Sequence, residues 1–323
     1  MDILWNSLRE IITPTTAAYA LAAIGLNVHF GFTGLLNFGQ AGFVAVGAYG
    51  FAIAVMTFGL STPLAIAVTM LLAAGYALLL GVPTLRLRAD YLAIVTIAAA
   101  EIIRFGLNSS AFAQWTGGAN GLYNEYSDWL KSSNPYPSGT LTLGPWTFTS
   151  NDLWIATVDW IVVAAVAGGI YLLVNSPWGR VLKGIREDEH AMLSLGKNVN
   201  LYKLQALVIG GLIGALAGIL YVQPTSVQPF DFGTRMTFNM YTMLILGGAA
   251  TVFGPVLGSM IFWVVMRFTD ELVGLGVQAG LFDNVTQGSQ LRFVLVGVAL
   301  VLLVVFRPQG ILGNRTELTF DAR

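Results

Sequence analysis

Long apolar runs recur along the chain and limit its fold more than any other feature. Each approaches the ~20 residues that an α-helix needs to cross ~30 Å of hydrocarbon. Only 10% of the residues are charged, against ~25% in soluble domains, so the chain cannot cover a water-soluble surface. The sequence therefore predicts an all-α fold, a polytopic transmembrane helix bundle of about 8–10 spans in a single membrane domain over residues 1–323. About nine windows carry the pattern, near residues 15–30, 36–57, 62–84, 90–107, 153–174, 204–222, 238–250, 254–269 and 290–306.

Two of these windows are interrupted by dense glycine clusters, GLLNFGQAGF at 34–43 and LGGAATVFGP at 246–255. Broken helices are tolerated in lipid where neighbouring helices or a polar cavity satisfy the freed backbone groups. Small residues also let helices pack closely, and the sequence leaves both readings open. The likeness of the two clusters suggests an internal repeat. We predict a translocation path at the polar and glycine residues around them: Asn27, Asn37, Gly39, Gln40, Gly247, Gly248 and Thr251.

Basic residues indicate which loops face the cytoplasm. Residues 176–203 carry five of them, whereas residues 108–150 carry Lys131 alone. The positive-inside rule places the first loop in the cytoplasm and the second outside, where we expect turns or short helices. Three arginines place the tail at 307–323 in the cytoplasm as well. The side of the N-terminus stays open.

The cytoplasmic loop contains a predicted short helix at residues 187–196. Acidic residues fill its first turn, where the helix dipole favours them, and a glycine stands where a left-handed C-terminal cap falls. A narrow apolar strip between them fits a groove on a partner protein, although a solvated connecting loop is the alternative. The residues of this docking element are Glu187, Asp188, Glu189, Ala191, Met192, Leu195 and Gly196.

Several classes of function are disfavoured by what the sequence lacks. It has no G-x-x-x-x-G-K-[ST] phosphate loop, no cysteine and only two histidines, so we expect no bound cofactor, no metal site and no catalytic set in this chain. A net charge of −1 gives no reason to expect nucleic acid. The N-terminal residues lack the pattern of a cleavable signal peptide.

For three polar residues inside the apolar windows, a structural role competes with a functional one. Glu101 and Arg104 share one face of their window near its outer end, where helix packing or snorkelling is favoured over contact with a substrate. His29, beside two phenylalanines, is expected to be a hydrogen-bonded structural histidine rather than a proton relay.

Six blocks in order resemble the branched-chain amino-acid ABC permease family, in particular its LivM-like subunits. They are GLNVHFGFTGLLNFGQAGFVAVGAYGFA at 25–52, LRLRADYLAIVTIAAAEIIR at 85–104, TGGANGL at 116–122, the stretch 176–221, GGAATVFGPVLGS at 247–259 and RPQGILG at 307–313. Within the fourth block, EHAMLSLG at 189–196 is similar to the EAA loop by which ABC importer permeases dock on their ATPases, and departs from it at the second alanine.

The resemblance implies a non-catalytic, multi-pass importer subunit in the bacterial plasma (inner) membrane that works by alternating access. Its implied partners are a homologous permease in a heterodimer, two cytosolic ABC ATPase subunits that hold ATP and Mg²⁺, and an extracytoplasmic substrate-binding protein. Residues 187–196 would then couple the ATPases to the bundle. Relatives that carry urea or short amides are an alternative, as is an ion-gradient-driven transporter; an intramembrane enzyme would need converging catalytic groups.

Overall fold

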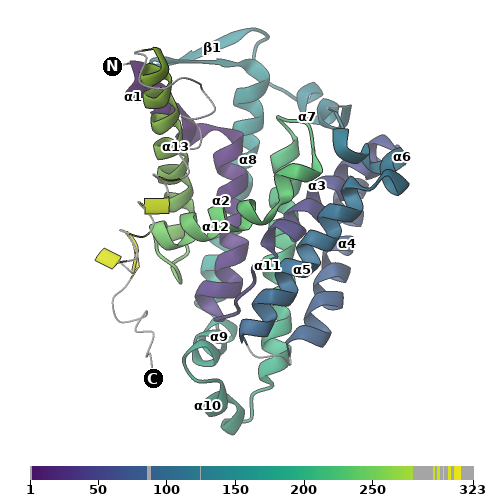
Figure 1. Ribbon diagram of the computed structural model, residues 1–323, viewed down its shortest axis with the longest axis vertical. Coiled ribbons are helices and arrows are strands. Elements are labelled where there is room, and N and C mark those ends of the chain that lie inside the picture. Colours follow the sequence, from purple (N-terminus) through teal and green to yellow (C-terminus); the bar gives the residue numbers. More distant parts are fainter. Residues whose placement is uncertain are drawn as a thin grey trace.

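A computed structural model of the chain describes residues 2–85, 89–123, 125–278 and 309–313, with positions 294, 297, 298, 301, 305 and 306. Over these residues the protein is a bundle of helices that follow the long axis of the molecule (Figure 1). The long helices are α2 (Pro14–Asn27), α3 (Gln40–Met56), α4 (Thr62–Thr84), α5 (Ala89–Asn108), α8 (Ser150–Val174), α11 (Val199–Val222), α12 (Thr234–Gly247) and α13 (Gly254–Gln278).

Four helices in the described part of the chain are long and apolar enough to cross a membrane, namely α4, α5, α8 and α11. A fifth crossing is formed if residues 3–12 and 14–32, which meet at a 52° bend, are one span. The predicted all-α membrane bundle is confirmed. The described residues thus supply four or five of the expected 8–10 spans, and most of the window at 290–306 lies outside them, so the number of spans stays a prediction.

The apolar windows locate most helix ends within a few residues. Helix α4 runs from Thr62 to Thr84, as its window predicts, with Pro63 in the first turn where its missing N–H is not needed. The window at 36–57 begins too early, because the helix starts only at Gln40. Gly34 takes a left-handed backbone conformation (φ +75°), and residues 34–39 are not helical.

The core of the bundle is formed by α2, α3 and α11. Every residue of α2 from Thr16 to Asn27 is buried. Helices α3 and α11 meet backbone to backbone, since a Cβ on Gly47 would overlap the carbonyl of Ala215 and one on Gly218 would overlap the carbonyl of Val44. Close backbone approach at small residues is a common way for membrane helices to associate.

Helices α4, α5 and α8 turn apolar side chains outward. Leu71, Leu79, Ile102 and Leu172 are each more than 70% exposed. Large exposed leucines and isoleucines along whole helices are compatible with hydrocarbon rather than water as the surrounding solvent.

The two ends of the bundle carry the shorter elements. At one end lie α1 (Asp2–Arg9) and an antiparallel hairpin of β1 (Thr140–Leu143) and β2 (Trp146–Thr149), and at the opposite end lie α9 (Pro177–Glu187) and α10 (Glu189–Ser194) (Figure 1). The loop at 108–150 also contains the predicted short helices, including η3 (Ser110–Phe112), α6 (Ala113–Thr116), η4 (Gly118–Asn120), η5 (Glu125–Ser127) and α7 (Asp128–Ser132). The hairpin was not predicted; the Trp146 indole donates to the Trp5 carbonyl (2.7 Å) and so joins it to α1.

Candidate translocation and coupling site

At each of the two glycine clusters, two consecutive long α-helices are separated by a break. The first break is residues 28–39, between α2 and α3, and it opens with a π-helical turn, η2 (Val28–Phe32). The second break is residues 248–253, between α12 and α13. Single π-helical turns inside α-helices are frequent at functional sites, which makes the first break a candidate functional element.

Buried polar side chains hold the first break in shape. The Asn37 side-chain amide donates to His29 Nδ1 (2.9 Å), and the Gly39 N–H donates to Asn37 Oδ1 (2.9 Å). Because Nδ1 accepts, Nε2 of His29 carries the hydrogen and donates it to the Leu207 carbonyl (3.1 Å). His29 is therefore a fully hydrogen-bonded histidine, as expected. Gln40 lies beside it and donates to the Gly210 carbonyl (3.3 Å).

Asn27 joins the first break to the second. Its side-chain amide donates to the Thr251 carbonyl (2.7 Å), and its Oδ1 accepts the Ala250 N–H (3.0 Å). Ala250 has a left-handed backbone (φ +62°), which is uncommon for a residue with a side chain. The paired hydrogen bonds from one buried asparagine stabilise that conformation, so the geometry of the second break depends on α2.

The second break is closed by local bonds of its own. Thr251 Oγ1 donates to the Gly248 carbonyl (2.7 Å) and accepts the Gly254 N–H (3.1 Å). Residues 309–313 lie against the same place, where the N–H groups of Ile311 and Leu312 donate to the carbonyls of Leu246 (3.0 Å) and Gly247 (2.9 Å). This segment, near the end of the chain, therefore completes the end of α12.

All seven predicted path residues lie in or beside these two breaks. Asn27, Asn37 and Gln40 are buried, with their polar atoms bonded to the protein. A Cβ on Gly39 would overlap the carbonyl of Thr96, and one on Gly247 would overlap that of Gly254, which favours close packing for these two glycines. Contact of the seven residues with a transported solute stays a prediction.

The short helix predicted in the cytoplasmic loop is present but shorter than expected, and its docking on a partner stays a prediction. Helix α10 covers Glu189–Ser194, and Gly196 has the left-handed conformation (φ +74°) expected of its C-terminal cap. The placement of Glu187 in its first turn is wrong, because Glu187 is the last residue of α9. Asp188 has an extended backbone that ends α9, and its side chain accepts the Ala191 N–H (3.0 Å) as the N-terminal cap of α10.

The apolar strip of α10 also differs from the prediction at one position. The Met192 side chain packs onto Gly184 of α9, so it holds the two helices together and is only partly exposed. Leu193, which sequence reasoning missed, is 50% exposed, and Leu195 is 72% exposed. Ala191 is exposed as well, and Leu195 is the residue that directly follows α10.

Side-chain contacts fasten α9 and α10 to the bundle, among them the hydrogen bond from the Trp178 indole to Gln205 of α11 (2.9 Å). Glu189 forms an ion pair with Lys203 of α11 (2.5 Å). Arg186 of α9 donates from Nη1 to the Gly31 carbonyl in the first break (2.6 Å), and its aliphatic stem lies against Gly34. From the sequence, Arg186 was identified only as a basic loop residue. Its hydrogen bond joins residues 155 positions apart, and no sequence pattern predicts it.

Comparisons with known proteins agree with this architecture. A family model described as branched-chain amino acid transport system / permease component matches residues 9–305. The high-affinity branched-chain amino acid transport system permease protein LivM of Escherichia coli (strain K12) is 32% identical over 320 residues, covering 93% of this chain and 69% of the relative. A probable LivM permease protein of Methanocaldococcus jannaschii is 26% identical, with 93% and 92% covered.

A second type of relative is the LivH permease protein of the Escherichia coli (strain K12) transport system, 25% identical with 92% of both chains covered. No solved structure matches the chain. The chain is a multi-pass membrane protein that belongs to the family of branched-chain amino acid transport system permease components.

Proposed function

We propose that this chain is the permease subunit of an ATP-driven importer of branched-chain amino acids in the bacterial plasma (inner) membrane. It would pair with a homologous permease and receive solute from an extracytoplasmic binding protein. Two cytosolic ABC ATPases would bind ATP with Mg²⁺, while this chain supplies the path and no catalysis. The family assignment and the relatives named for branched-chain amino acid transport support the substrate class.

One observation carries the coupling part of the proposal: a capped helix with exposed leucines packs on α9, and α9 is hydrogen-bonded to the first break of the bundle. Leu193 of α10 and Leu195, which directly follows it, are exposed and would contact the ATPase. Met192 of α10 packs on Gly184 of α9, so a displacement of α10 would move α9. Arg186 of α9 donates to the Gly31 carbonyl, so the first break would move with α9. Asn27, one turn before Gly31, is bonded to the second break.

These contacts describe how a cytosolic event would change the accessible side of the bundle. Movement of α10 by the ATPases shifts α9 as a rigid piece, and the π-helical turn at Val28–Phe32 follows it. The second break would then rearrange as well, since the Asn27 side chain accepts the N–H of Ala250, whose backbone is left-handed. A displacement at one end is thereby converted into a change between two packed arrangements.

Changes in α10 are expected to separate ATP hydrolysis from uptake. Glu189→Lys breaks the ion pair with Lys203, and Gly196→Val places a β-branched residue at φ +74°. In the complete transporter in proteoliposomes, each variant should hydrolyse ATP while leucine uptake falls at least about tenfold, or about 1.4 kcal/mol of coupling. Ser194→Ala on the same helix is the matched control and should transport normally. Coupled uptake at the normal rate in both variants would contradict the proposal.

A further inference from the structure

A cavity of about 330 Å³ lies away from the two breaks, where α5 meets α2, α11 and the start of α12. The rings of Tyr19 and Tyr221, 6.1 Å apart and edge to face, form part of its wall, and Phe230 and Met236 add apolar surface. Its volume is at the lower end of the ~300–1,000 Å³ of small-molecule sites. The cavity is thus large enough for a small solute with an aliphatic side chain.

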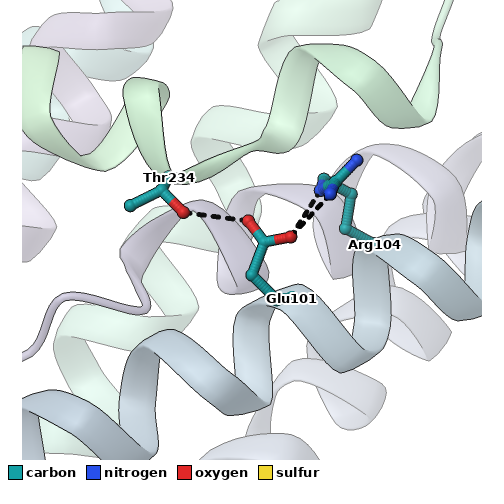
Figure 2. Close-up of polar contacts among 3 residues, drawn as sticks. All are labelled: Glu101, Arg104 and Thr234. Carbon is teal, nitrogen blue, oxygen red and sulfur yellow. Dashed lines mark hydrogen bonds and ion pairs between the residues drawn. The ribbon is translucent and has the colours of Figure 1, made fainter.

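Charged groups of both signs line this cavity. Figure 2 shows Glu101 of α5 between Arg104, to which it is paired at 2.7 Å, and Thr234 of α12, whose hydroxyl donates to its second oxygen at 2.9 Å. Asp231 and Arg235 line the cavity as well. The wall therefore carries two acids and two bases, and its formal charge is balanced.

The packing role expected for Glu101 is part of the explanation for this cluster. Helix α12 begins after Gly233, which has no side chain to cap it, and the Glu101 carboxylate lies at that positive helix end. A capping role explains one carboxylate, but it requires neither Asp231 nor two arginines around open volume. Charged groups in membrane segments are costly and commonly mark a solute pathway.

We propose that this cavity binds the zwitterionic head of a free aliphatic α-amino acid during its passage through the permease. The ammonium group lies toward Glu101 and Asp231. The carboxylate lies toward Arg104 and Arg235, and the aliphatic side chain lies on the aromatic wall. This inference rests on the proposed function and narrows it, because a neutral amide such as urea would form no ion pair with these groups.

The chain contains no cysteine, so a single introduced cysteine is the only thiol that a reagent can modify. Asn239→Cys, introduced in the cavity wall of the full-length chain in nanodiscs, is modified with a small thiol reagent, and the rate is measured with and without L-leucine. We expect L-leucine to slow modification severalfold. At the same concentration, 4-methylpentanoate, 3-methylbutylamine and urea should give little protection, because each lacks one or both charged groups of the amino acid.

Two variants, each made by adding one further substitution to the Asn239→Cys chain, distinguish ligand binding from helix packing. Glu101→Gln should abolish protection by L-leucine. Glu271→Gln is the matched control, since Glu271 forms an ion pair of similar length with Arg267 (2.9 Å) on α13 and does not line the cavity. Protection should survive the control change. Equal loss in both variants, protection that persists in Glu101→Gln, or no protection in their parent would each overturn the cavity assignment.

The result can be read independently of the proposed function. If the complete transporter shows ATP-driven leucine uptake but L-leucine does not protect the introduced thiol of the Asn239→Cys chain, the cavity assignment alone fails. If protection has the expected pattern but uptake needs no ATPase, the ATP-driven mechanism fails and the cavity assignment remains.

Discussion

Replacing Arg186 with alanine is expected to reduce coupled leucine uptake by at least about tenfold while the protein stays folded in the membrane. The guanidinium group donates to the Gly31 carbonyl at 2.6 Å, and this hydrogen bond connects α9 to the first break. Hydrogen bonds from charged groups contribute about 1.5–3 kcal/mol, enough for a tenfold or larger change in the population of a coupled state. The measurement is ATP hydrolysis and uptake side by side in proteoliposomes that contain the complete transporter.

Two further variants make the Arg186 result specific. Arg180→Ala is the matched control, because Arg180 lies on the same helix and is exposed, so uptake should be normal. Arg186→Lys keeps the charge but loses the planar guanidinium geometry and should give intermediate uptake. If Arg186→Ala transports as well as Arg180→Ala, α9 does not act through Gly31, and the proposed route through the first break is wrong.

The second large effect is a loss of folding when Gly218 is replaced by leucine. Even a single Cβ at this position would overlap the Val44 carbonyl, so α3 and α11 would have to separate at the centre of the bundle. Overpacking of a rigid backbone contact costs about 3 kcal/mol or more, a large part of the stability of a typical domain. We expect little Gly218→Leu protein in the membrane fraction and a strongly lowered melting temperature in detergent.

The control for this prediction is the same change where the structure has room. Gly168 lies on the exposed face of α8, and a Cβ there would meet nothing within 4 Å. Gly168→Leu should therefore accumulate and melt as the unchanged protein does. Equal stability of the two leucine variants would show that the close approach of α3 and α11 is not required for the fold.

The sequence predicted local features of the fold better than the contacts between distant residues. Helix α4 follows from an uninterrupted apolar run with a proline at its start, and the cap at Gly196 follows from the freedom of glycine to take a positive φ. The hairpin of β1 and β2 was missed because TLTL and WTFT are short and lie in a loop rich in turn residues. Its attachment to Trp5 bridges 141 positions, which no local pattern reports.

In the candidate site, too, local features could be predicted from the sequence and contacts between distant residues could not. Glycine density identified both breaks, but the hydrogen bond between Asn27 and Thr251, 224 positions apart, can be seen only in the folded chain. Met192 was assigned to the outward strip because its spacing fits; the direction of its side chain depends on Gly184, in the preceding helix. Glu101 and Arg104 were identified as a pair, whereas the cavity beside them needs residues from four separate helices and a connecting segment.

We propose that this bundle is driven from the cytosol through α10 and has no energy source of its own. The most direct test of this proposal is leucine uptake into proteoliposomes by the complete transporter, compared with the purified chain alone. We expect leucine to accumulate only when the ATPases, ATP and Mg²⁺ are present, with no uptake by the chain alone. Leucine movement by the isolated chain, without any nucleotide-hydrolysing partner, would contradict it.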